Sequence, residues 1–300
     1  MSKLTQPIKW HGGKHYLAEW IISLMPPHLH YVEPFFGGGS VLLTRDPALD
    51  WMLTPEGSLP SFLKGCSEVV NDVNRELTNF WQVLRDPELY PQFRQVLELT
   101  PFSQIEWEES ESRLQSTDPV EAAAAFFIRA RMCRQGIAKS FATLSRNRTR
   151  RRMNEQVSSY LTAVEGLQEV HQRLRNVVIL NDDACTVIKK QDGYNTLFYC
   201  DPPYVHETRA TVNAYEFEMD LEHHQRLLET LAQVAGKFML SGYRCSLYDE
   251  FAEKHGWRRE DKLIDNKASR AKVKEKKCEC LWMNFAAEET TTNGVPTFNS

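Results

Sequence analysis

The residues from Asp201 to Tyr204, Asp-Pro-Pro-Tyr, directly follow the apolar run 196–200, which predicts a buried strand. An exocyclic amine such as that of adenine is a poor nucleophile, because its lone pair is delocalised into the ring. The Asp201 carboxylate and the Pro202 carbonyl could accept hydrogen bonds from its two N–H groups. Pro202 and Pro203 lack N–H donors and stiffen the turn, and Tyr204 could stack on the base. The pattern favours a site that holds a flat amine, although a turn that merely ends a strand is the ordinary alternative.

Three consecutive glycines follow an expected strand in "EPFFGGGS", residues 33–40. Glycine permits positive φ and lets a ligand approach the backbone closely. The spacing differs from G-x-G-x-x-G, which disfavours a dinucleotide site. Asp72, at the end of the next expected strand, could accept hydrogen bonds from two ribose hydroxyls or could cap a helix. Together the turn and Asp72 favour a nucleoside-containing cofactor over a turn without a ligand.

Basic residues are concentrated between Arg129 and Arg152, a stretch with eight arginines, Lys139 and no acidic residue. The preceding "EWEESESR" is acidic, so the charges are segregated. An uncompensated run of this kind favours contacts with nucleic-acid phosphates over a solvated helical face, and arginine also suits guanine in the major groove. The candidate DNA-binding residues are Arg129, Arg134, Lys139, Arg146, Arg148, Arg150, Arg151 and Arg152. A second basic run at 262–277 could flank the catalytic face or form a lysine-rich loop.

Hydrophobic periodicity predicts the elements that position these residues. Strands are expected at 29–33, 67–71, 176–181, 196–200, 237–243 and 278–285, with helices after most of them. The segment 46–66 is expected to be a surface loop, and 86–175 is expected to be helical with no strand, including "RNRTR". This order predicts an α/β fold, a mostly parallel sheet interrupted by a helical insertion.

Composition excludes several other classes of protein. Hydrophobic residues make up 42% of the 300 residues, and the net charge is −4. No run is long enough to span a membrane, and the N-terminus has no apolar segment of a secretory signal. The seven cysteines are scattered, so we expect reduced thiols in a cytoplasmic protein, and no metal site.

Five motifs occur in a characteristic order along the chain. They are Lys9-Trp10-x-Gly12-Gly13-Lys14, Glu33-Pro34-Phe35-Phe36-Gly37-Gly38-Gly39, Asn71-Asp72, Asp183 and Asp201-Pro202-Pro203-Tyr204. This order resembles that of the Dam-like DNA adenine-N6 methyltransferases, in a phage or prophage-type branch, over most of residues 7–285. The resemblance does not extend to the Asn-Val-Pro-Phe-Gly stretch usual in enzymes that methylate GATC.

The resemblance implies a Rossmann-like methyltransferase sheet, S-adenosylmethionine as methyl donor and a flipped adenine in double-stranded DNA as acceptor. It implies that the donor is bound by Trp10, Gly12, Gly13, Lys14, Glu33, Phe36, Gly37, Gly39, Asp72 and Asp183. Asp182 is the alternative to Asp183. Residues 1–85 and 176–285 would form the catalytic domain, 86–175 the target-recognition domain and 286–300 a loose tail.

Three other interpretations stay open at this point. An RNA or protein-amide methyltransferase could share the fold, although Asp201 stands where the protein-glutamine branch has asparagine. A DNA-binding relative without activity would not need an intact Asp201 and Tyr204. An oxidoreductase fits the glycine spacing poorly. No nuclease motif is found, so restriction would require a separate chain, and the oligomeric state could be a monomer or a homodimer.

Overall fold

The computed structural model describes residues 4, 6–46, 65–134, 139–142, 144, 146–205, 219–265 and 276–287. Two compact units make up the chain. Unit 1 comprises 1–22, 36–46 and 72–181, and unit 2 comprises 23–35, 47–71 and 182–300. Among the described residues, no helix combines the length and apolar character needed to cross a membrane.

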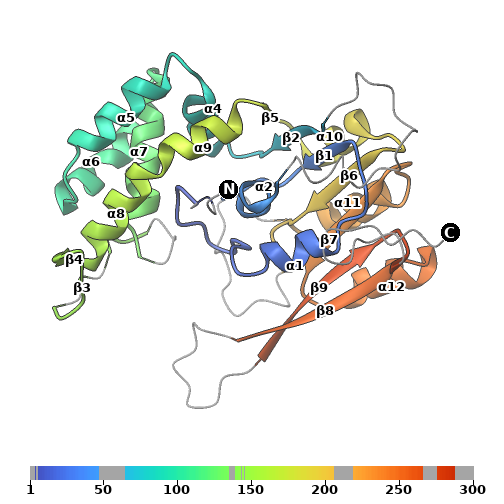
Figure 1. The fold of residues 1–300 in the computed structure, drawn as a ribbon. Coiled ribbons are helices and arrows are strands. Elements are labelled where there is room, and N and C mark those ends of the chain that lie inside the picture. Colours follow the sequence, from blue (N-terminus) through green and yellow to red (C-terminus); the bar gives the residue numbers. More distant parts are fainter. Residues whose placement is uncertain are drawn as a thin grey trace. The chain divides into compact units, whose positions relative to one another are not determined.

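Seven strands form the main sheet, in the order β5-β2-β1-β6-β7-β9-β8 (Figure 1). They are β1 (His30–Glu33), β2 (Ser67–Asn71), β5 (Val177–Leu180), β6 (Thr196–Cys200), β7 (Lys237–Gly242), β8 (Arg258–Asp265) and β9 (Lys276–Met283). Strand β1 runs parallel to β2 and β6, and β6 runs parallel to β7, whereas β9 is antiparallel to both β7 and β8. The predicted mostly parallel α/β sheet is confirmed.

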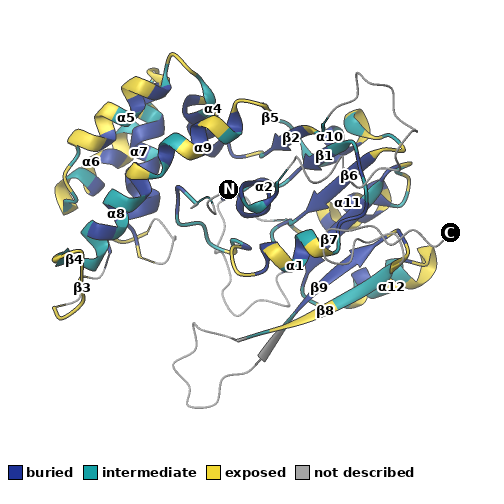
Figure 2. Cartoon of the chain, in the orientation of Figure 1, coloured by how far each residue is buried: buried dark blue, intermediate teal, exposed yellow. Residues whose placement is uncertain are grey.

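The position of β6 at the centre of the sheet explains why this strand is so apolar. All five residues of β6 are buried, as are the last three of β1 (Figure 2). A strand covered on both faces needs a continuous apolar run rather than an alternating one. Because β1 and β6 are parallel neighbours, with Val32 paired to Phe198, their carboxyl ends lie at the same edge. Glu33 ends β1 there, and Asp201 follows β6.

The helices of unit 2 begin at polar capping residues. They are α10 (Ala184–Gln191), α11 (Leu221–Leu231) and α12 (Ser246–His255). Asp183 caps α10 by accepting a hydrogen bond from the Thr186 N–H, and Asp220 caps α11 through the His223 N–H. Such side chains satisfy N–H groups that have no partner inside the helix.

The helical part of unit 1 is built around an aromatic core. Its helices are α4 (Arg75–Arg85), α5 (Tyr90–Leu99), α6 (Gln104–Arg113), α7 (Pro119–Met132), α8 (Glu155–Glu165) and α9 (Leu167–Leu174), with the shorter α2 (Ser40–Thr44) after the glycine turn; α1 (Ala18–Ser23) ends just past unit 1. Phe80 lies 6.3 Å from Phe127 and 6.0 Å from Phe93, measured between ring centroids. The predicted helical character of this region is confirmed by α5 to α9.

The prediction that 86–175 contains no strand is wrong at one place. Strands β3 (Thr149–Arg150) and β4 (Met153–Asn154) form an antiparallel hairpin in the segment expected to be helical. Arg151 and Arg152 make its two-residue turn with φ of 54° and 63°. Such turns usually contain glycine or asparagine, so the arginines gave no signal for it. Arg151 is fixed by two hydrogen bonds of 2.9 Å to the Glu165 carboxylate.

Strand β8 was also missed, because its sequence "RREDKLID" is mostly charged. It pairs along its whole length with β9, an edge arrangement in which charged residues are common. The basic run 262–277 therefore includes the ends of both strands, and its residues 266–275 lie outside the described part. The same holds for 47–64 of the predicted loop and for 288–300 of the predicted tail.

Candidate functional site

The glycine turn of unit 1 is closed by a carboxylate. The Gly37 N–H donates to Asp72 Oδ2 at 2.9 Å, and the Asn74 N–H donates to Asp72 Oδ1 at 2.9 Å. On its other side, the indole N–H of Trp81 donates to the Gly37 carbonyl at 3.0 Å. Asp72 thus joins the turn after β1 to the turn after β2 within unit 1.

The glycines of this turn leave no room for a side chain. A Cβ on Gly37 would lie 2.6 Å from the Trp10 indole nitrogen, and one on Gly38 would lie 2.7 Å from the Trp10 Cβ. At Gly39 a Cβ would approach the Phe36 ring to 2.9 Å, and both Gly37 and Gly39 have positive φ. The structure therefore brings together Trp10, Phe36 and the triple glycine, as the motif order predicts.

Burial dominates the electrostatics of Asp72. It raises the pKa of the Asp72 carboxyl, and the N–H groups of Asn74 and Gly37 offset only part of this effect. A carboxylate that is costly to ionise gains from a ligand that donates hydrogen bonds to it. The oxygens of Asp72 therefore fit a hydroxyl-bearing or cationic cofactor.

The N-terminal motif lies in the same unit as the glycine turn. The Gly13 N–H donates to the Trp10 carbonyl at 3.2 Å, and Gly12 has a φ of 76°. The Lys14 ammonium is buried and donates to the Gly12 carbonyl at 3.1 Å. This segment forms a tight loop whose cationic side chain is turned back onto its own backbone.

Unit 2 places Asp201-Pro202, the segment predicted to supply the acceptor oxygens and called the acceptor turn below, at the carboxyl end of the central strand β6. Asp201 is half-buried and Pro202 is buried, directly after the fully buried β6. At the end of the neighbouring β1, the buried Glu33 accepts a hydrogen bond from the Tyr31 hydroxyl at 2.7 Å. Burial raises the pKa of Tyr199 on β6, and the negative charges of Asp201, Glu279 and Glu33 raise it further.

A residue that the sequence analysis did not single out contacts the motif tyrosine. The Tyr204 hydroxyl donates to Glu279 Oε1 of β9, and the rings of Tyr204 and Tyr243 lie edge to face at 4.7 Å between centroids. Glu279 lies inside the strand predicted at 278–285, but no role was predicted for it. An acidic residue one step inside a buried strand was the available signal.

Asp182 and Asp183 both lie at the start of α10, and both have lowered pKa values. Burial alone would raise the pKa of Asp183, but hydrogen bonds from Thr186 and the charge of Arg226 hold it below its ordinary value. Asp182 accepts from the Lys190 ammonium at 2.9 Å, which lowers its pKa most, and from the Asp183 N–H at 2.8 Å. The amide of Asn71 binds the carbonyls of Pro34 and Asp182, each at 3.0 Å, and so fixes this loop.

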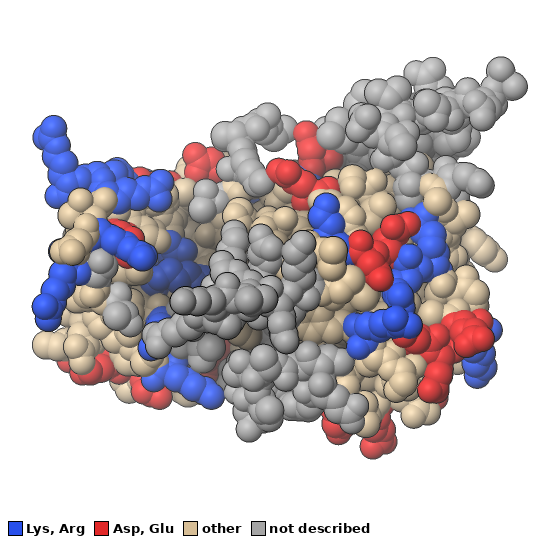
Figure 3. Space-filling view, turned by 90° about the horizontal axis from the view of Figure 1, so that it is seen from below, with Lys and Arg blue, Asp and Glu red and all other residues tan. Residues whose placement is uncertain are grey.

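The predicted DNA-binding residues fall into two groups. Arg129 is only 9% exposed, stacks over the Trp107 ring at 4.7 Å and donates to the Trp107 carbonyl, so its position argues for a structural role. The other members are exposed, and Figure 3 shows Lys and Arg side chains gathered at the end of unit 1 where Figure 1 places β3 and β4. They are Arg134, Lys139, Arg146, Arg148, Arg150, Arg151 and Arg152.

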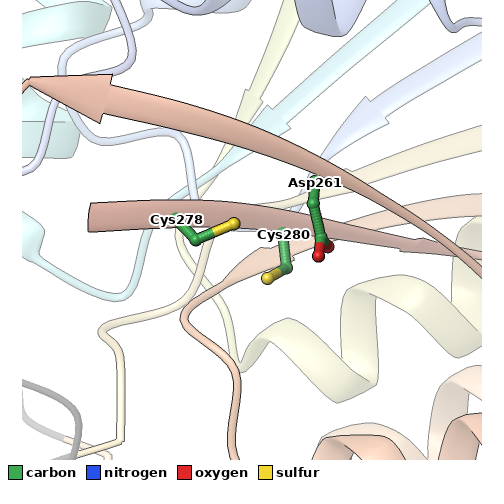
Figure 4. A group of neighbouring side chains, drawn as sticks. All are labelled: Asp261, Cys278 and Cys280. Carbon is green, nitrogen blue, oxygen red and sulfur yellow. The ribbon is translucent and has the colours of Figure 1, made fainter. Parts of the chain in front are cut away.

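One group of side chains among the described residues has the types of a metal site. The ligand atoms of Asp261, Cys278 and Cys280, on β8 and β9, lie within 4.8 Å of one another (Figure 4). Burial raises the pKa of the Cys280 thiol, and the charge of Asp261 raises it further. Arg259 also donates to Asp261 at 2.9 Å. Asp261 is thus paired with Arg259, and three side chains are one fewer than the four ligands of a structural zinc site, so we assign no metal to this group.

The mostly parallel sheet, the glycine turn after β1 and the acceptor turn after β6 define an α/β enzyme of the Rossmann-like methyltransferase class. Residues 10–271 match the family of D12 class N6 adenine-specific DNA methyltransferases. The chain belongs to this family and is an adenine-specific DNA methyltransferase, which agrees with the resemblance found in the sequence.

Curated relatives carry names of the same kind. The type II methyltransferase M1.LlaDCHI of Lactococcus lactis subsp. cremoris is 26% identical over 256 residues, which cover 81% of this chain and 82% of that protein. The DNA N-6-adenine-methyltransferase of Escherichia phage P1 is 26% identical over 237 residues, 74% of this chain but 27% of the phage protein. A DNA adenine methylase of Vibrio cholerae is 33% identical over 91 residues, 30% of this chain and 26% of that protein.

Proposed function

We propose that the chain transfers a methyl group from S-adenosylmethionine to N6 of an adenine flipped out of double-stranded DNA. The observation that carries this proposal is the acceptor turn Asp201-Pro202 at the end of β6, the buried central strand of the sheet. An adenine amine inside a duplex is unreachable, which is why extrusion is required. The same chain would work in the cytoplasm, where DNA and reduced thiols are found.

Each unit contains motif residues that are candidates for binding the donor. In unit 1 these are Trp10, Gly12, Gly13, Lys14, Phe36, Gly37, Gly39 and Asp72. Asp72 is the best supported, because burial makes its charge costly and hydroxyl donors would stabilise it. In unit 2 the candidates are Glu33 and Asp183, with Asp182 as the alternative to Asp183.

The acceptor turn would activate the amine through its oxygens. The Asp201 carboxylate and the Pro202 carbonyl would each accept one N–H of the adenine, which localises the nitrogen lone pair. When bound, the cofactor supplies an electrophilic methyl group on a positively charged sulfur. The amine would release one proton as it accepts the methyl group, and the Asp201 carboxylate would be a suitable acceptor for that proton.

The hairpin β3–β4 of unit 1 would contact the DNA. Its exposed arginines are Arg150, Arg151 and Arg152, and the exposed Arg146 and Arg148 directly precede β3. A two-stranded ribbon fits the major groove, where arginine binds guanine, and arginines on its flanks suit phosphates. We also propose that residues 1–85 and 176–285 form a catalytic domain and that residues 86–175 form a recognition domain. The protein would act as a monomer or as a homodimer.

The test is methyl transfer from labelled S-adenosylmethionine to duplex DNA that contains unmethylated adenine. We expect label in N6-methyladenine, and Asp201→Ala should lower the rate by at least about a hundredfold, because a group that positions and polarises the amine is lost. Asp261→Ala, which removes an exposed carboxylate of the same unit, serves as the matched control and should stay active. Label found in cytosine alone, or an active Asp201→Ala variant, would reject the proposed chemistry.

A further inference from the structure

Glu279 is a carboxylate inside the molecule, only 2% exposed, on strand β9. Burying a carboxylate costs free energy unless hydrogen bonds or a charged partner compensate for it. One of its described contacts is with the motif tyrosine, because the Tyr204 hydroxyl donates to Glu279 Oε1. A buried acidic side chain is thus directed at the turn that carries the acceptor oxygens.

Sheet register explains why a third residue reaches the same place. In the antiparallel pair β7–β9, Gly242 is opposite Cys280 and Ser241 is opposite Leu281. Continued by one residue, this register puts Tyr243 opposite Glu279. The Tyr243 ring lies at 76° to the Tyr204 ring, with centroids 4.7 Å apart, a favourable edge-to-face geometry. Tyr204 is therefore fixed at its hydroxyl by Glu279 and at its ring by Tyr243.

The Tyr204 hydroxyl stays protonated, which agrees with its role as a hydrogen-bond donor. Burial raises its pKa well above the ordinary value, and the negative charges of Asp201 and Glu279 raise it further. The hydroxyl therefore keeps its proton and acts as a donor to Glu279. A hydrogen bond with an ionised acceptor is stronger and more directional than one between neutral groups, so it suits a side chain that must keep one orientation.

We propose that Glu279 is a positioning residue for methyl transfer, which acts by fixing the ring of Tyr204 in the orientation that stacks on the target adenine. Glu279 would not touch the base or the methyl donor. This inference rests on the proposed function, because it requires Tyr204 to face the adenine. The competing explanation is that the Tyr204–Glu279 contact only stabilises the junction between β9 and the turn after β6.

Kinetics of a double-mutant cycle separate the two explanations. Glu279→Ala should lower kcat for methyl transfer to duplex DNA by about tenfold, the size expected for loss of one hydrogen bond to a charged group. The KM for S-adenosylmethionine should stay unchanged. Tyr204→Phe keeps the ring but removes the hydroxyl, and the double variant should be no slower than the slower single variant, because both changes break the same contact.

Two further variants complete the design. Glu279→Gln keeps the shape and an acceptor oxygen but not the charge, so its kcat should lie between those of the parent and Glu279→Ala. Glu260→Gln changes a carboxylate on the neighbouring strand β8 and serves as the matched control, with kcat expected at the parent value. Thermal unfolding of each variant reports the folded fraction at the assay temperature, to which each rate is normalised.

The outcomes decide between the proposals. The positioning role is supported if Glu279→Ala lowers kcat in the parent but lowers it no further in the Tyr204→Phe variant, with the KM for the donor unchanged. Additive losses, or rates that return to the parent value after normalisation to the folded fraction, overturn it. If Asp201→Ala is inactive while Glu279→Ala is fully active, the proposed function stands and only this inference falls. If Asp201→Ala is active, the proposed function itself fails.

Discussion

One half-buried carboxylate, Asp72, carries the strongest expectation about cofactor binding. Asp72→Asn should weaken binding of S-adenosylmethionine by tenfold or more, because the neutral amide offers one acceptor oxygen where the carboxylate offers two. Titration calorimetry measures this affinity directly. Unchanged affinity in Asp72→Asn would remove Asp72 from the proposed cofactor site.

Thermal unfolding without ligand provides the control for Asp72→Asn. Because burial raises the pKa of Asp72, ionisation costs stability in the folded state. This contribution favours the folded state below the carboxyl's ordinary pKa and is lost as the pH rises through the raised value. At pH 7 the neutral asparagine avoids that cost, so the midpoint of unfolding should be no lower than that of the parent. A lower midpoint at pH 7 would show that the two backbone hydrogen bonds outweigh the burial of charge.

The sequence predicts single residues well where local chemistry defines them. Gly37 and Gly39 were expected at a turn and do have positive φ, and Asp201 was expected directly after a buried strand. Glu279 was missed because its importance comes from a contact across 75 positions of the chain. Arg129 was assigned to DNA by the charge of its neighbours, whereas its packing on Trp107 depends on helix α6, which no local pattern connects to it.

At the scale of elements, apolar runs and capping residues were sufficient signals. Strand β6 and helix α4 lie close to their expected positions, since both combine a continuous hydrophobic pattern with clear ends. The elements that were missed lack such a pattern. Strand β8 is charged and exists because β9 pairs with it, and the hairpin β3–β4 turns at two arginines that have no intrinsic preference for positive φ.

The turn of the β3–β4 hairpin should be strained, which gives a test with a matched pair of variants. Arg152 has a φ of 63°, a conformation that costs a residue with a side chain about 1 kcal/mol relative to glycine. Arg152→Gly should therefore raise the free energy of unfolding by up to that amount, whereas Arg152→Ala, which keeps the Cβ, should not. Chemical denaturation measures both values. Equal stability of the two variants would show that the turn relaxes at no cost.

DNA affinity of the two Arg152 variants is a separate matter from their stability. Both variants lose the same positive charge, so both should bind duplex DNA about equally weakly relative to the parent. Arg151→Gly is expected to behave differently, because it also removes the two hydrogen bonds to Glu165 that hold the turn onto α8. It should gain less stability than Arg152→Gly, or lose stability.

For the whole molecule, a net charge of −4 must be reconciled with a polyanionic substrate. The distribution of charge resolves this, because arginines are concentrated at 146–152, on and just before the hairpin, whereas α6 is rich in acidic residues. Binding driven by phosphate contacts weakens with salt, and each contact contributes about 0.9 to the slope of log affinity against log salt. The location of positive charge, rather than the net charge, should therefore set the salt dependence of the chain.

Two triple variants test this expectation. The first variant changes Arg146, Arg148 and Arg150 together to Ala. The slope of log affinity against log salt should become shallower by about two to three, because each substitution would remove one phosphate contact. The control variant changes three exposed residues outside the basic segment 146–152, namely Arg175, Lys189 and Lys254, to Ala. It removes the same charge and should leave the slope nearly unaltered. Fluorescence anisotropy with labelled duplex DNA measures the affinity of both variants, at salt concentrations from about 50 to about 200 mM. Equal reductions in the two variants would mean that net charge governs binding and that these three arginines make no direct contact with the phosphates.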